Sequence, residues 1–201
     1  MAVGRISERA WGWIGPISVA LLAFILRIWN VGYPHKLEFD ETYYGKDAWS
    51  LLQHGYVQDW VENANTKIAA GHYSPSLMTG LPTEIVHPDG GKWMIAIGES
   101  IFGFNSFGWR ISAVVVGALT VLVLARLVRR LTGSTVIGCF AGLLLCFDGM
   151  HFVMSRLALL DVFLTFWVVC GVACLVADRD WIAERLVRYR PFRPWQLGAG
   201  A

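Results

Sequence analysis

The sequence has 201 residues, of which 55% are apolar and only 16% are charged, whereas a soluble domain is usually about 25% charged. Because the apolar residues also come in long blocks, the composition excludes an ordinary soluble domain and indicates an integral membrane protein. The net charge of +2 gives no sign of nucleic-acid binding, and we expect no nucleic acid among the partners.

Neither cysteines nor metal-ligand patterns point to a site. The four cysteines lie inside apolar blocks and are interpreted as small buried hydrophobic residues rather than as a disulfide set or a zinc site. The sequence has no metal-ligand spacing and no glycine-rich phosphate loop. A divalent metal held by Asp40, Glu41 and Asp89 is an alternative that nothing in the sequence requires, so no metal site is predicted.

Residues 1–29 form an N-terminal tail and the first predicted transmembrane helix. The tail carries Arg5 and Arg9, and the stretch Trp11–Trp29 is apolar up to Arg27, which is long enough to cross about 30 Å of hydrocarbon. A cleavable signal peptide is the competing interpretation. The length of the run, Arg27 at its far end and the lack of an A-x-A site favour an uncleaved helix.

Residues 30–106 form one long polar loop with nine acidic residues, four lysines and four prolines. An amphipathic helix is predicted near its start, because apolar side chains recur at helical spacing after three acids in four residues. Asp40 is placed to cap this helix, and Glu41 lies in its first turn. The apolar side chains of this helix are Tyr44, Ala48, Leu51 and Leu52.

A second amphipathic helix is predicted later in the loop, over Lys92–Phe104. Trp93, Ile97 and Ile101 lie along one side of it, and its charged residues lie elsewhere. Such helices commonly lie in the headgroup plane of a membrane, so we expect the apolar stripe to contact lipid.

Residues 107–177 are predicted to hold transmembrane helices two to four. Arg110 lies near the start of the second. Asp148 lies near the far end of the third, where it could bond a neighbouring helix, and Arg156 follows in a short turn. Asp161 lies in the first turn of the fourth. The three spans are Phe107–Val128, Thr135 to about Val153, and Leu157–Ala177.

Residues 178–201 are predicted to be a cytoplasmic basic segment and the start of a fifth apolar segment. The polar part, residues 178–194, contains five arginines, and the last seven residues resemble a helix cut short. The chain is therefore interpreted as the N-terminal portion of a longer protein. We expect this portion alone to be inactive, because four helices do not enclose two substrates.

The distribution of charge predicts how the chain crosses the membrane. The N-terminal tail, residues 126–130 and residues 178–194 carry ten arginines, whereas the 30–106 loop carries four lysines against nine acids. The positive-inside rule therefore places the N-terminus in the cytoplasm and the loop outside. Five ionisable residues then gather at the outer membrane face beside the acidic pair. They are Arg27, Arg110, Asp148, Arg156 and Asp161.

Ionisable residues at a membrane face suggest chemistry, because placing them there is costly. Arg110 and Arg156 carry the planar fork that matches phosphate oxygens. Asp40 could take a proton from an acceptor hydroxyl if proton transfer is late and water is excluded. Structural alternatives stay open: Asp40 and Glu41 as a solvated helix start, both arginines extending to headgroups, and Arg156 paired with Asp161.

Four motifs follow one another along these predicted elements. The acidic motif Phe39–Lys46 (FDETYYGK) follows the first span, and His87–Trp93 (HPDGGKW) comes later in the loop. Arg110 opens the second span, and Ser155–Asp161 (SRLALLD) enters the fourth. In this order, over about residues 20–180, they resemble the protein O-mannosyltransferase family, close to its actinobacterial branch.

The second motif departs from the family's H-P-P-x-G-K pattern. Asp89 and Gly90 stand where the family has its second proline and the next residue. The change loosens the turn and adds a charge near Lys92, so the resemblance fixes the positions of His87 and Lys92 less firmly. From the sequence alone, a histidine such as His87 is more often an ordinary loop residue than a catalytic one.

The resemblance implies an all-α, multi-spanning glycosyltransferase of the lipid-donor type (GT-C-like). About four transmembrane helices would lie in this portion, with amphipathic helices in the outer loop. The donor would be polyprenyl-phosphate-mannose, and the acceptor a Ser or Thr hydroxyl of an unfolded exported protein. Transfer would invert the sugar at the outer face of the plasma membrane, with the export machinery as a candidate partner.

The resemblance also implies roles for particular residues. Asp40 would be the catalytic base, and Glu41 would orient the acceptor or the surroundings of Asp40. His87 and Asp161 would support the site, Asp161 by ordering Arg156. The residues expected to face the donor phosphate are Arg110, Lys92 and Arg156.

Two other functions are kept as alternatives. A related lipid-donor transferase could act on a glycolipid or a cell-wall polymer, as aminoarabinose and arabinose transferases do, and acceptor assays with peptide against lipid would separate the two. A transporter or channel subunit would spread its charges through the depth of the membrane, whereas here they gather at one face.

Overall fold

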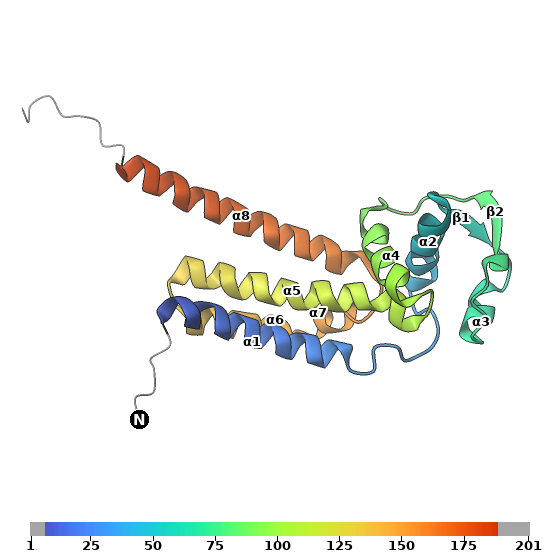
Figure 1. Ribbon diagram of the computed structural model, residues 1–201, viewed down its shortest axis with the longest axis horizontal. Coiled ribbons are helices and arrows are strands. Elements are labelled where there is room, and N and C mark those ends of the chain that lie inside the picture. Colours follow the sequence, from blue (N-terminus) through green and yellow to red (C-terminus); the bar gives the residue numbers. More distant parts are fainter. Residues whose placement is uncertain (1–6, 189–201) are drawn as a thin grey trace, which may run out of the picture.

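The computed structural model describes residues 7–188, which form a bundle of long helices with a small folded region at one end (Figure 1). Three helices are long and apolar enough to cross a membrane, and they lie within α1 (Glu8–Ile28), α5 (Ser106–Thr132) and α8 (Leu160–Arg188). The structure thus confirms the multi-spanning helical fold that the apolar blocks predict.

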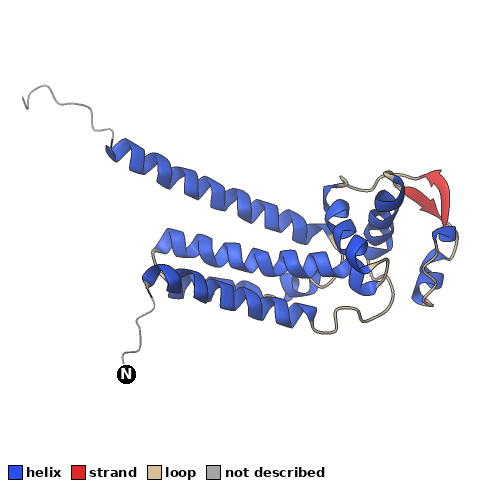
Figure 2. Ribbon diagram, viewed as in Figure 1, coloured by secondary structure: helices blue, strands red, loops and turns tan. Residues whose placement is uncertain are grey.

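The loop between α1 and α5 folds into a small region of its own. Its elements are α2 (Glu41–His54), β1 (Gln58–Trp60), α3 (Ala64–Ala69), a 3-10 turn (Pro75–Leu77), β2 (Met78–Pro82) and α4 (Gly90–Phe102). The two strands pair antiparallel, and Figure 2 shows them at the end of the molecule away from the long helices. The strand pair is absent from the sequence prediction, whereas α4 begins and ends only two residues earlier than predicted.

The third predicted span is broken, which corrects the prediction of one helix over residues 135–153. α6 (Thr135–Phe147) has 13 residues and is about 20 Å long, shorter than the roughly 30 Å of hydrocarbon. Asp148 follows it, and its side chain accepts a 2.7 Å hydrogen bond from the His151 N–H to cap a new helix, α7 (Gly149–Met154). Asp148 is therefore a helix cap rather than a link to a neighbouring span.

The boundaries of the last span also differ from the prediction. α8 begins at Leu160 and continues past the predicted end at Ala177 as far as Arg188, so the polar stretch after Ala177 extends the same helix. Its length of about 43 Å exceeds the hydrocarbon thickness. The predicted start of a fifth segment, within residues 189–201, and the first six residues of the tail lie outside the described part of the chain.

The largest apolar core lies where the small region meets the bundle. Trp109 of α5 is 0% exposed, and its ring centroid lies 5.3 Å from that of Phe104. Tyr44 of α2, Ile95 of α4 and Phe163 of α8 belong to the same cluster. This core holds the beginning of α2 against the beginning of α8, the two elements that carry the candidate site.

Candidate active site

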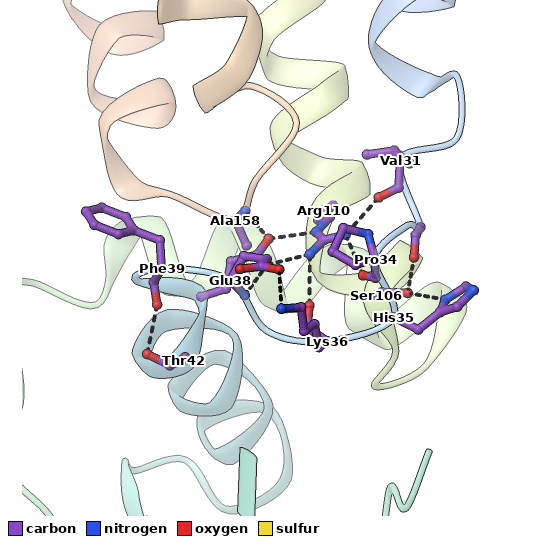
Figure 3. Close-up of polar contacts among 12 residues, drawn as sticks. Val31, Pro34, His35, Lys36, Glu38, Phe39, Thr42, Ser106, Arg110 and Ala158 are labelled. Atoms are coloured by element: carbon purple, nitrogen blue, oxygen red, sulfur yellow. Dashed lines mark hydrogen bonds and ion pairs between the residues drawn. The ribbon is translucent and has the colours of Figure 1, made fainter. Parts of the chain in front are cut away.

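Glu41 and Arg110 form a buried ion pair at the beginning of α2. Arg110 Nε and Nη2 lie 2.8 and 2.7 Å from the two carboxylate oxygens of Glu41, which is 0% exposed. The remaining guanidinium N–H groups donate to the carbonyls of Val31, Pro34 and Lys36 (Figure 3). All five N–H groups of Arg110 therefore bind protein acceptors, and its expected contact with a donor phosphate stays a prediction.

Glu41 also joins α2 to the turn that precedes α8. Its Oε1 accepts a 2.9 Å hydrogen bond from the Ala158 N–H, and its Oε2 accepts one of 3.0 Å from the Glu38 N–H. With both Arg110 bonds, the carboxylate receives four donors and has no free lone pair aimed at a cavity. Glu41 thus fixes the position of its neighbour, Asp40, instead of contacting an acceptor itself.

Asp40 stands at the N-cap position of α2, as predicted, but its side chain makes no capping hydrogen bond. It is half-buried and lines a cavity of about 850 Å³ between α2, the beginning of α4 and the first turns of α8. The α8 side of this cavity is apolar, with Phe163, Leu164 and Trp167 in its wall. We call it the Asp40 cavity.

The structure brings three predicted site residues together in the Asp40 cavity, since His87 and Asp161 also line it. The ring of His87 meets the ring of Tyr44 edge-on, with centroids 6.0 Å apart. His87 has a φ of 64°, a backbone conformation that costs energy for a non-glycine residue and occurs often at functional sites.

Tyr44 is a residue of the site that the sequence analysis treated only as an apolar helix residue. Burial raises the pKa of its hydroxyl, and the negative charges of Asp40, Asp161 and Asp47 raise the pKa further. The phenol therefore stays protonated at neutral pH and keeps a hydrogen-bond donor at the cavity wall. Its place four residues after Asp40, on the same helix face, is the signal that could have found it.

Arg156 lies away from this cavity, which corrects the prediction that Asp161 orders it. Its Nη2 donates a 2.7 Å hydrogen bond to the Trp29 carbonyl, and its guanidinium lies 5.3 Å from the centre of the Phe152 ring. It lines a separate, smaller cavity of about 150 Å³ beside the end of α1. Arg110 lines this smaller cavity together with Arg156.

Lys92 is also placed differently from the prediction. It is 0% exposed, and its Nζ lies 3.1 Å from Asp47 Oδ2 and 3.1 Å from Asp89 Oδ1. Burial raises the pKa of Asp47, and the Lys92 ammonium opposes that rise. Lys92 thus links α2 to the beginning of α4, and Asp89, the residue that departs from the family motif, supplies one of its two partners.

The acids proposed as an alternative metal site do not face a common point. Glu41 binds Arg110 and Asp89 pairs with Lys92, while Asp40 lines the cavity. Across residues 7–188, no three His, Cys, Asp or Glu side chains lie close enough to share a metal ion.

Comparison with known proteins decides the family. A family model described as dolichyl-phosphate-mannose-protein mannosyltransferase matches residues 17–195. The chain belongs to this family. A polyprenol-phosphate-mannose–protein mannosyltransferase of Mycolicibacterium smegmatis is 39% identical over 210 residues, which cover 96% of this chain and 37% of that protein. A protein of the same name in Mycobacterium tuberculosis is 41% identical over 182 residues, which cover 89% of this chain and 31% of that protein.

The chain therefore spans about a third of the length of those relatives. An undecaprenyl phosphate-alpha-4-amino-4-deoxy-L-arabinose arabinosyl transferase of Pseudomonas aeruginosa is 36% identical over 136 residues, which cover 68% of this chain and 22% of that protein. No solved structure matches the chain. The family assignment confirms the resemblance carried by the four motifs.

Proposed function

We propose that the whole protein transfers mannose from polyprenyl-phosphate-mannose to a Ser or Thr hydroxyl of an exported protein, with Asp40 as the base. One observation carries the proposal for this chain: Asp40 alone of the acidic pair faces a cavity, because Glu41 is held by four N–H donors. The names of the mycobacterial relatives supply the donor and the class of acceptor.

In the proposed reaction, the acceptor oxygen attacks the anomeric carbon of the mannose and forms the new glycosidic bond. Its proton passes to the Asp40 carboxylate. The bond between the anomeric carbon and the phosphate oxygen breaks, and its electron pair leaves with the polyprenyl phosphate. Attack from the face opposite the leaving group inverts the anomeric centre. In this proposal, the apolar side chains of α8 that line the cavity limit the water around the reacting groups.

The leaving phosphate needs a cation, and the described part of the chain offers little for it. The lining of the Asp40 cavity contains His87 but none of the described arginines or lysines. Arg110 and Lys92 are bound to Glu41, Asp47 and Asp89. We therefore propose that His87 contacts the phosphate from the cavity rim and that the main cation comes from the part of the protein beyond this third.

The proposed location is the plasma membrane, with the N-terminus in the cytoplasm and the small region outside. Arg129 and Arg130 lie in the last turn of α5, at the end of the bundle opposite the small region (Figure 1). The positive-inside rule supports this orientation. It puts the Asp40 cavity where an exported polypeptide, delivered by the export machinery, meets a lipid-linked sugar.

Replacing Asp40 with Asn in the whole protein tests the proposal. We expect kcat to fall by about 10²- to 10⁴-fold, the usual contribution of a general base. The KM for the donor, the KM for the acceptor and the thermal unfolding midpoint should change little. Glu38→Gln is the matched control, because Glu38 pairs at the surface with Lys36, and it should retain full activity. An Asp40→Asn protein that keeps full transferase activity would contradict the assignment.

A glycolipid acceptor is the second candidate, since the arabinosyl transferase relative covers two thirds of this chain at 36% identity. Incubating the whole protein and polyprenyl-phosphate-mannose with either a Ser/Thr peptide or membrane glycolipid separates the two. We expect mannose on the peptide. Mannose found only on the lipid would contradict the proposed protein acceptor and favour a glycolipid acceptor.

A further inference from the structure

A second cavity, of about 540 Å³, lies against a neighbouring face of α2 and shares no lining residue with the Asp40 cavity. Its walls come from α2, β1, α3 and the residues just after β2. Nothing in the proposed mechanism uses it. We call it the outer cavity, because Figure 1 shows α3 and both strands at the end of the molecule farthest from the long helices.

The first two turns of α2 form the partition between the two cavities. Asp40 and Tyr44 face the Asp40 cavity, whereas Tyr43, Lys46 and Asp47 line the outer cavity. Tyr43 comes three residues after Asp40, and Asp47 comes three after Tyr44, so the two sets of side chains lie on neighbouring faces of one helix. The two cavities share no lining residue, although the consecutive residues Tyr43 and Tyr44 line different ones. A chain in the outer cavity therefore lies beside the helical turn that carries Asp40.

The side chains of the outer cavity suit a polypeptide better than a lipid. Asn65 and Thr66 of α3 and Thr83 after β2 offer amide and hydroxyl groups at its wall. Trp60 adds an aromatic surface, with Lys46 Nζ 5.9 Å from its ring centre. The Trp60 indole N–H is buried and has no acceptor among the described residues. Together with the ring of Tyr43, this mixture of donors, acceptors and aromatic surface can bind backbone groups and small polar side chains.

We propose that the outer cavity binds the unfolded acceptor polypeptide, holding the residues beside the Ser or Thr that receives mannose. This inference rests on the proposed function, which gives the acceptor class. The two substrates then approach from different sides. The lipid-linked donor comes along the apolar wall of α8, and the polypeptide comes from the side away from the membrane helices.

The experiment places the photo-crosslinking residue p-benzoylphenylalanine at Asn65 or at Lys67 in the whole protein. Both side chains are exposed on α3, but only Asn65 lines the outer cavity. A labelled Ser/Thr peptide should crosslink from position 65 and not from position 67. Absence of crosslinking from position 65, or equal crosslinking from both, would overturn the acceptor site.

A kinetic measurement gives a second, independent readout. Asn65→Trp fills the outer cavity, and we expect it to raise KM for the peptide about tenfold, equivalent to about 1.4 kcal/mol of binding free energy, with KM for the donor unchanged. Lys67→Trp should change neither. An Asn65→Trp protein with an unchanged peptide KM would contradict the inference. Crosslinking of the peptide from position 65, together with a wild-type protein that transfers no mannose, would instead overturn the proposed function and leave the peptide site standing.

Discussion

At residue scale, the two adjacent acids differ in the donors that surround them. The Glu41 carboxylate receives four N–H groups, from Arg110, Ala158 and Glu38. The Asp40 carboxylate makes no capping bond and faces a cavity. A carboxylate with four donors has little capacity to accept a further hydrogen bond. The structure therefore separates an acid held by its neighbours from one that faces a cavity.

We expect Glu41→Ala to destabilise the protein by about 3–5 kcal/mol, because it leaves the buried Arg110 guanidinium without a counter-charge. The measurement is the free energy of unfolding in detergent. Asp40→Asn is the matched comparison and should cost far less, since Asp40 is half-buried and makes no capping bond. Equal stability of Glu41→Ala and wild type would show that this ion pair does not hold α2 in place.

At the scale of single elements, α4 has two opposite faces. Trp93, Ile97 and Ile101 are 44%, 57% and 67% exposed, which agrees with the predicted apolar stripe. The opposite face buries Lys92 and Glu99, at 0% and 1% exposure. Lys92 has two acidic partners, but neither carboxylate oxygen of Glu99 has a hydrogen-bond partner among the described residues. Burial raises the pKa of Glu99 well above its usual value.

This shift predicts how stability depends on pH. Because the pKa of Glu99 is raised in the folded state, the folded protein binds more protons than the unfolded one above about pH 4.5. The free energy of unfolding therefore falls as the pH rises from the unfolded pKa towards the folded one. The stability that protonated Glu99 contributes is fully present below the unfolded pKa. Glu99→Gln cannot titrate and should flatten the decline. Thermal unfolding midpoints between pH 4.5 and 8 measure this decline in stability. Glu62→Gln is the control, because Glu62 is exposed. An unchanged slope in Glu99→Gln would contradict this assignment.

The elements also show what local sequence can and cannot predict. The two longest spans and α2 follow from apolar runs and helical spacing. The break after α6 has a local signal, an Asp-Gly pair at a cap position, which the length of the apolar run concealed. By contrast, Arg110 and Glu41 are 69 residues apart in the sequence. Their pairing requires the beginning of α5 to lie against the beginning of α2. No local sequence pattern encodes this contact.

Long-range packing also decides which of the predicted site residues lie together. Asp40, His87 and Asp161 belong to the predicted motifs, and the fold brings them to one cavity. Lys92 and Arg156 belong to the same motifs, but the structure gives each of them other partners. Charge type predicts which ligand a side chain suits, but whether it is free to bind depends on long-range partners.

At the scale of the whole molecule, α5 is the central helix and α8 the peripheral one. In the apolar segment of α5 61% of the residues are buried, against 11% in that of α8. α8 therefore offers most of its apolar surface to its surroundings, and the same helix forms the apolar wall of the Asp40 cavity. A long isoprenoid chain can lie along this surface while its sugar reaches Asp40.

The partition formed by α2 has a consequence for turnover. The two cavities lie against neighbouring faces of one helix and share no lining residue. If they hold the two substrates as we propose, each can fill while the other is occupied, and a ternary complex can assemble in either order. Initial-rate plots at several fixed donor concentrations should therefore give lines that intersect, whereas parallel lines would indicate a ping-pong cycle through a glycosylated enzyme. In the same proposal, the spent carrier would diffuse sideways into the bilayer and the modified polypeptide would depart into the aqueous phase, so neither product would obstruct the release of the other.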